Sequence, residues 1–159
     1  MQLEMSDGRF FSLRVERYEF PDEELGPTDD NPADEFDTGR FLVVAVAFRN
    51  ADGAWQASGP IMETTELERF TDWMESILEG TPLSDGVYFT ERDLEFTIDN
   101  TAGKLLVHAC WDFSPSWETS EEGVTIDFAI DQVDMLGAIE SLRSQLRFFP
   151  GRPPIRLAP

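Results

Sequence analysis

Residues 40–50 read RFLVVAVAFRN and give the strongest strand signal in the chain. Apolar side chains occupy both faces of this segment, which is typical of a central strand covered on both sides. The turn Ala51-Asp52-Gly53 follows and leads into AWQASGPIM (54–62). A tight Gly-containing turn between two such segments predicts an antiparallel hairpin at the centre of the fold.

A second hairpin is predicted upstream of this one. Residues 3–15 alternate between apolar and polar side chains around the turn Ser6-Asp7-Gly8. Period two around a Gly-containing turn is typical of a β-hairpin. Tyr18 and Phe20 fall out of this phase, which indicates a bulge near Arg17.

Two amphipathic helices are predicted, over TTELERFTDWMESILEG (64–80) and DQVDMLGAIESLRSQLRFF (131–149). Thr65 with Glu68 predicts a capping box for the first helix, and Gly80 its end. Asp131 is the predicted N-cap of the second. The apolar stripes that must be buried are Leu67, Phe70, Trp73, Met74, Ile77 and Leu78, then Val133, Leu136, Ile139, Leu142, Leu146 and Phe149.

The remaining strand signals are VYFTE (87–91), DLEFTID (93–99), KLLVHACWDF (104–113) and VTIDFAI (124–130). Strand runs joined by short turns favour antiparallel pairing over crossovers. The sequence therefore predicts a single α+β domain over residues 1–159, with an antiparallel sheet of about eight strands and two amphipathic helices packed on it. Residues 21–39 are expected to form an acidic loop and residues 150–159 an irregular tail.

The chain has 159 residues and a formal net charge of −20, from 32 acidic and 12 basic side chains. Such a charge repels nucleic acid and anionic membranes, so neither is expected as a partner. No segment has the roughly 18 apolar residues of a membrane span, no signal core is visible, and the one cysteine excludes an internal disulfide. These features predict a cytoplasmic protein. The acidity fits three interpretations: solubility alone, adaptation to high salt, or steering of a cationic partner.

The acidic stretch PDEELGPTDDNPADEFD (21–37) does not match a calcium loop. An EF-hand needs oxygen ligands at alternating positions and a glycine at the sixth. Counted from Asp29, the fifth residue is Ala33 and the sixth is Asp34. We therefore predict no cofactor or metal, and interpret the stretch as a solvated connector or a docking surface for a basic partner.

No catalytic motif emerges from the sequence. His108, Cys110 and Asp112 share one face of a predicted strand, but residues two apart on a strand lie ~6.5–7 Å apart, beyond hydrogen-bond reach. The motifs G-x-S-x-G, G-x-G-x-x-G and H-E-x-x-H and the P-loop are all missing from the sequence. A non-enzymatic protein is expected.

The tryptophans divide by pattern. Trp55, Trp73 and Trp111 lie at predicted core positions, whereas Trp117 lies in the polar loop SPSWETSEEG (114–123) beside several carboxylates. An aromatic side chain in an acidic loop either anchors a partner or folds back to close the loop.

Several segments resemble the WapI-type immunity proteins. They are YEFP (18–21), the acidic loop closing at Asp37 before RFLVV, the hairpin with Trp55, TTELERFTDWMESIL, VYFTERDLEF and RFFPGRP (147–153). That family consists of small bacterial cytosolic proteins that neutralise the C-terminal nuclease domain of a wall-associated contact toxin. The resemblance spans nearly the whole chain and implies its fold and a toxin partner, with no particular functional residues.

The leading hypothesis is a non-enzymatic binding protein that neutralises a basic nuclease toxin domain through an acidic surface. Two alternatives remain open: an acidic scaffold or oligomerising domain, and a carboxylate site for a hard cation. The residues predicted to bind a partner are Asp22, Glu23, Glu24, Asp29, Asp30, Asp34, Glu35, Asp37, Trp117, Glu118, Glu121 and Glu122.

Overall fold

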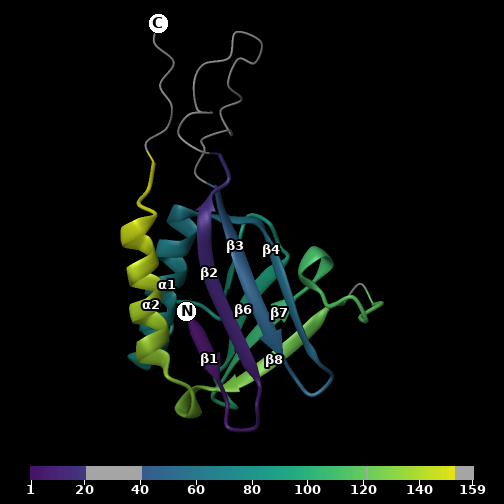
Figure 1. Ribbon diagram of the computed structural model, residues 1–159. Coiled ribbons are helices and arrows are strands. Elements are labelled where there is room, and N and C mark those ends of the chain that lie inside the picture. The colour runs from purple at the N-terminus through teal and green to yellow at the C-terminus, as the bar shows by residue number, and fades with distance from the viewer. Residues whose placement is uncertain (21–40, 121, 153–159) are drawn as a thin grey trace, which may run out of the picture.

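The chain runs through strands, a helix, a second set of strands and a second helix (Figure 1). The computed structural model describes residues 1–20, 41–120 and 122–152. The predicted acidic loop 21–39 and most of the tail 150–159 lie outside these residues. The described elements are β1 (Gln2–Glu4), β2 (Phe10–Tyr18), β3 (Phe41–Arg49), β4 (Ala54–Glu63), α1 (Thr64–Leu78), β5 (Gly86–Tyr88), β6 (Leu94–Asp99), β7 (Lys104–Ala109), η2 (Trp111–Phe113), β8 (Val124–Ala129), η3 (Ile130–Gln132) and α2 (Met135–Phe148).

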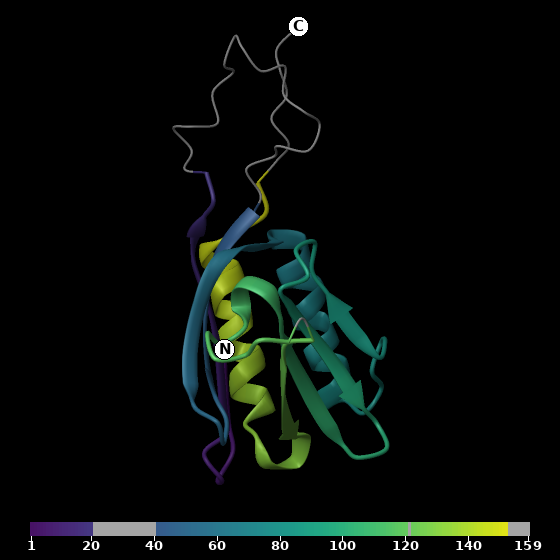
Figure 2. The same ribbon diagram turned by 90° about the vertical axis from the view of Figure 1, so that its right-hand side faces the viewer.

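All neighbouring strands pair antiparallel, in the orders β1-β2-β3-β4 (sheet A) and β5-β6-β7-β8 (sheet B). For the described residues, the predicted α+β fold of eight antiparallel strands and two helices is confirmed, except that the strands form two sheets and not one. Helix α1 separates β4 from β5 and carries the chain from sheet A to sheet B. Figure 2 shows the sheets edge-on as separate layers, with α2 behind the space between them. Among the described residues, neither helix is long and apolar enough to cross a membrane.

The core lies between the sheets and contains a cluster of phenylalanines. Phe11 of β2 contacts Phe48 of β3 at 5.1 Å and Phe96 of β6 at 5.5 Å, measured between ring centroids. Phe70 of α1 contacts Phe96 at 4.3 Å. These rings are 0–2% exposed, and burying each one stabilises the fold by roughly 1.5–3 kcal/mol. Phe96 thus joins sheet A, sheet B and α1.

The predicted stripe of α1 is buried except for Leu78, which is 49% exposed. The capping box forms two residues earlier than predicted: the Glu63 backbone N–H donates to Glu66 Oε2 at 2.9 Å. The reason is that α1 begins directly where β4 ends, so Glu63 takes the N-cap position and Thr65 lies inside the first turn. Gly80 has a φ of 76° and follows the helix, as predicted.

Helix α2, by contrast, starts later than its predicted cap. Residues 130–132 form η3, so Asp134 and not Asp131 is the N-cap, and it accepts the Gly137 N–H at 2.9 Å. This changes which side chains of the first turn face the core. Met135 and Ala138 are buried, whereas the predicted core residue Leu136 is 56% exposed.

The free edge of β2 is covered by a side chain of α2. The predicted bulge is confirmed as a register shift between Val15 and Arg17. At this edge Gln145 Oε1 accepts the Val15 N–H at 2.6 Å, and Gln145 Nε2 donates to Leu13 O at 3.4 Å. One amide side chain therefore replaces a neighbouring strand at an edge that would otherwise be open to pairing.

Residues 18–20 and 149–152, which belong to the segments YEFP and RFFPGRP, meet at the end of β2. The Arg152 guanidinium lies 3.4 Å from the centroid of the Tyr18 ring and donates to Phe20 O at 2.7 Å. The Tyr18 hydroxyl donates to Pro150 O, and its ring meets Phe149 edge-on at 5.6 Å. These contacts join the chain after α2 to the end of β2.

Candidate partner-binding surface

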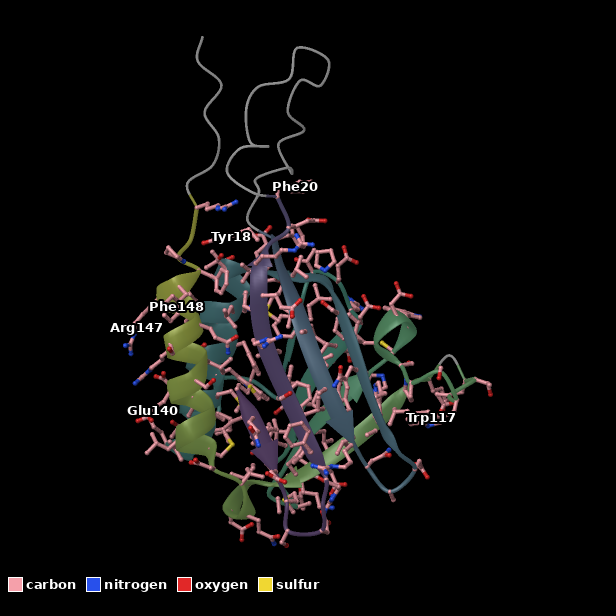
Figure 3. The ribbon with its side chains drawn as sticks, viewed as in Figure 1. Tyr18, Phe20, Trp117, Glu140, Arg147 and Phe148 are labelled. Carbon is pink, nitrogen blue, oxygen red and sulfur yellow. The ribbon has the colours of Figure 1, made fainter. Side chains whose placement is uncertain are left out.

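Trp117, Glu118 and Glu122 are predicted partner-binding residues that the structure describes, and they lie on one segment. This segment, residues 110–123, joins β7 to β8. Figure 3 shows Trp117 on the side of the molecule opposite Phe148 of α2. The other predicted residues lie outside the described part of the chain: Asp22, Glu23, Glu24, Asp29, Asp30, Asp34, Glu35, Asp37 and Glu121.

Segment 110–123 is anchored to the core near its start. Cys110 is buried, and its backbone N–H donates to Asp93 O at 3.0 Å. Phe113 is 2% exposed. Its carbonyl oxygen accepts the indole N–H of Trp55, a core residue as predicted, at 2.9 Å. These contacts hold the segment against β4 and the loop before β6.

Trp117 folds back onto the β3–β4 hairpin. Its ring meets Trp55 edge-to-face at 5.7 Å, and Trp55 stacks on Phe48 at 4.6 Å. Gly53 makes this approach possible, because a Cβ there would lie 2.9 Å from Trp117 Cη2. Such an aromatic pair contributes about 0.5–1.5 kcal/mol. Trp117 therefore closes the loop in part, while 46% of its surface stays exposed.

Trp111 does not lie in the core, and the sequence prediction for it is wrong. β7 ends at Ala109, and η2 begins at Trp111 with a φ of +47°. Among the described residues, Trp111 is the one non-glycine with a positive φ. The turn buries Phe113 and leaves Trp111 62% exposed. This left-handed backbone costs an L-residue about 1–2 kcal/mol.

The prediction missed Trp111 because it extended the strand alternation through residues 104–113. Ser114-Pro115-Ser116 follows directly, and proline cannot donate to a strand ladder. That signal favours an earlier end of the strand. The positive φ has no signal in the sequence, since glycine or asparagine usually occupies such a position.

The tryptophans of this segment lie among carboxylates. Asp112, Glu118 and Glu122 belong to the same segment, and no lysine or arginine occurs between Lys104 and Arg143. The Ser120 backbone N–H donates to Glu118 Oε1 at 2.8 Å, and this bond holds the pKa of Glu118 below its usual value. Glu118 is therefore ionised at neutral pH.

Exposed arginines lie on a different surface, and two of them form ion pairs there. The face of sheet A turned away from sheet B carries Arg14, Arg17 and Arg49. Arg14 Nη2 lies 2.9 Å from Glu16 Oε1, and Arg49 Nη2 lies 3.7 Å from Glu4 Oε1. An open groove of about 840 Å³ lies between this face and α2, and Glu4, Arg14 and Asp134 are among its lining residues.

His108 and Cys110 make separate hydrogen bonds, so the cysteine is not activated by the histidine. His108 Nδ1 lies 2.9 Å from Thr125 Oγ1, and the Cys110 thiol donates to Arg92 O at 3.0 Å. Burial, with smaller contributions from nearby carboxylates, raises the pKa of the Cys110 thiol, which stays protonated at neutral pH. Within the described ranges, no group of three or more His, Cys, Asp and Glu side chains could hold a metal ion.

The structure defines a class: an α+β protein with two four-stranded antiparallel sheets, two helices, and exposed aromatic and acidic side chains on the segment between β7 and β8. The model of the Immunity protein WapI-like family matches residues 2–150, and the chain belongs to this family. The resemblance seen in the sequence is thereby confirmed. No curated protein and no solved structure matches the chain.

Proposed function

We propose that this chain is a non-enzymatic immunity protein that acts in the cytoplasm and neutralises a basic nuclease toxin domain by binding it. Membership of the immunity protein family over residues 2–150 carries this proposal. Immunity by binding needs a stable complementary surface and no catalytic group. The protonated Cys110 thiol and the separate bonding of His108 are compatible with such a role.

The proposed mechanism is electrostatic attraction of the toxin domain, followed by blocking of its nucleic-acid-binding surface. A net charge of −20 attracts a basic domain and raises its association rate. Carboxylates at the interface then occupy the surface that binds nucleic-acid phosphates. The proposed partner-binding residues are Asp22, Glu23, Glu24, Asp29, Asp30, Asp34, Glu35, Asp37, Trp117, Glu118, Glu121 and Glu122.

Rescue of growth tests the proposal directly. Toxin domains encoded beside this chain are expressed in bacteria with and without it. The proposed function predicts that one domain stops growth alone and that this chain restores it, whereas a toxin domain from an unrelated system stays lethal. Failure to rescue growth from any neighbouring toxin would contradict the proposal.

The contribution of the stretch 21–37 is tested by association kinetics. One variant replaces its eight carboxylates with Asn or Gln. We expect slower association with the rescued toxin domain and a weaker dependence on salt, since steering is screened by ions. Unchanged kinetics would remove this stretch from the mechanism.

A matched control loses the same number of charges elsewhere on the molecule. If location matters as well as net charge, this control changes the association rate less than the variant of residues 21–37. Its substitutions to Asn or Gln fall at Glu4, Glu68, Asp72, Glu79, Asp85, Glu91, Asp131 and Glu140, which are exposed.

A further inference from the structure

We propose that Trp111 is the anchor of the toxin-binding surface and that it docks against a basic patch of the toxin domain, with Trp117 six residues further along the same segment. This inference rests on the proposed function and assigns it to segment 110–123. The anchor surface consists of Trp111, Asp112, Trp117, Glu118 and Glu122, on segment 110–123.

Two local features of Trp111 work against folding. Its φ of +47° suits glycine or asparagine and not a bulky side chain. Its 62% exposure leaves a large apolar ring in water. Glycine would avoid both, and the fixed neighbours Cys110 and Phe113 would still be buried. Folding therefore gains little from tryptophan at this position.

Hydrogen bonds hold the backbone turn that carries Trp111, so little of this turn has to be ordered when a partner binds. The Cys110 backbone N–H donates to Asp93 O, and the Phe113 backbone N–H donates to Cys110 O, both at 3.0 Å. The Ser114 N–H closes the turn on Trp111 O at 3.1 Å. A tryptophan held on a rigid turn loses little conformational freedom on binding, and tryptophan is enriched among the residues that dominate interface energies.

The charge around Trp111 selects the kind of partner. The backbone N–H of Asp112 donates to Asp93 Oδ1 at 3.2 Å, so a second carboxylate lies beside the turn. Glu118 and Glu122 lie further along the segment, and the sequence from residue 105 to 142 contains no lysine or arginine. One arginine approaches from another loop: Arg92 is exposed, and its carbonyl oxygen accepts the Cys110 thiol at 3.0 Å. An arginine or lysine of a partner is attracted by the face of the indole through a cation–π interaction and by the charge of the nearby carboxylates.

The same charges disfavour other occupants. A second copy of the chain would bring a net charge of −20 against an acidic surface, and nucleic acid would be repelled as well. The exposed Phe148 offers a contrast, because it lies on α2 next to Arg147 on the opposite side of the molecule (Figure 3). Phe148 therefore provides the matched control.

The experiment measures the affinity of the catalytically inactivated toxin domain identified by growth rescue. Calorimetry compares the wild type with Trp111→Gly, Trp111→Asn and the control Phe148→Ala, and thermal unfolding of each free protein is recorded. Both Trp111 variants are expected to weaken binding at least fivefold, because they remove the indole ring. Neither should lower Tm, because glycine and asparagine tolerate the positive φ. Phe148→Ala is expected to bind as tightly as the wild type.

Every other outcome overturns the inference. If the wild type binds and the Trp111 variants lose less than fivefold, the anchor is wrong while the proposed function stands. A drop in Tm in both variants would make Trp111 a structural residue. Self-association of the wild type that the Trp111 variants abolish would assign the surface to a second copy. If the wild type binds no toxin domain, the proposed function fails first.

Discussion

At the scale of single residues, a row of rings connects the core to the candidate surface. Phe48, Trp55 and Trp117 contact one another in succession, from a buried strand to a half-exposed loop. The indole N–H of Trp55 also fixes the carbonyl of Phe113, which follows Trp111 by two positions. The exposed tryptophans are thus positioned by the same core residue.

Trp117→Ala should lower the free energy of unfolding by about 1–2 kcal/mol, since it removes an aromatic pair and half-buried apolar surface. Leu83→Ala serves as the control, because Leu83 is 72% exposed and should change stability by less than about 0.5 kcal/mol. Urea unfolding followed by circular dichroism measures both. Equal stability of the two variants would show that Trp117 does not pack on Trp55 in solution.

Asp127 predicts a defined dependence of stability on pH. Lys104 Nζ lies 2.8 Å and Arg9 Nη1 2.6 Å from its carboxylate oxygens, and these bonds lower the pKa of Asp127. A folded-state pKa below the unfolded value adds stability above pH ~4 that is lost as the pH falls through the folded value.

Asp127→Asn should therefore lower the free energy of unfolding at pH 7 by about 1 kcal/mol or less, because the pair is partly exposed to solvent. The difference from the wild type should vanish as the pH falls below about 4. Lys104→Gln should give a smaller change of the same sign. Urea unfolding across pH 2–8 measures this, and a difference that persists near pH 2 would contradict it.

At the scale of elements, the periodicity of apolar residues predicted most strands, turns and helices within short stretches of the chain. The hairpins, the stripe of α1 and the bulge near Arg17 follow from the spacing of neighbouring residues, and the structure confirms them. The caps were displaced because β4 runs directly into α1 and η3 precedes α2. Both displacements depend on where the preceding element ends, which residue spacing inside the helix does not encode.

The cap of α2 gives a matched pair of substitutions. Asp134→Ala removes the acceptor of the Gly137 N–H and should destabilise the protein by about 1 kcal/mol. Asp131→Ala, at the cap expected from the sequence, should leave stability within about 0.5 kcal/mol of the wild type. Thermal and urea unfolding compare the two. A larger loss in Asp131→Ala would show that the helix begins earlier than described.

The edge of β2 gives a second test at this scale. Gln145→Leu keeps a similar volume but leaves the Val15 N–H without its acceptor at 2.6 Å. An unsatisfied backbone donor that is shielded from water costs about 1–3 kcal/mol. Unfolding measurements should show this loss, and the Val15 amide should exchange faster with solvent. Unchanged exchange at Val15 would contradict the role of Gln145 in covering the edge.

At the scale of the whole molecule, the arrangement of sheets and charges could not be read from the sequence. Pairing of strands within each half follows from short turns, but the division into sheets A and B depends on contacts between distant residues such as Phe11 and Phe96. The sequence likewise indicated Trp117 through its acidic neighbours. For Trp111, Ser114-Pro115-Ser116 favours an early end of the strand, but the positive φ could not be predicted, because it runs against the preference of tryptophan.

The overall arrangement separates two surfaces of different chemistry. Sheet A presents Arg14, Arg17 and Arg49 on its outer face, whereas segment 110–123 presents tryptophans and carboxylates. Membership of the immunity protein family makes a toxin the expected partner. Segment 110–123 contains no lysine or arginine, and we propose it as the contact for a basic toxin domain.

Titration of toxin nuclease activity tests neutralisation by binding most directly. The active toxin domain is held at a fixed concentration, and nucleic-acid cleavage is measured as this chain is added at physiological salt. Neutralisation by binding predicts that cleavage falls in proportion to the chain added and reaches background near one equivalent. Undiminished cleavage in the presence of a severalfold molar excess of folded chain would contradict it.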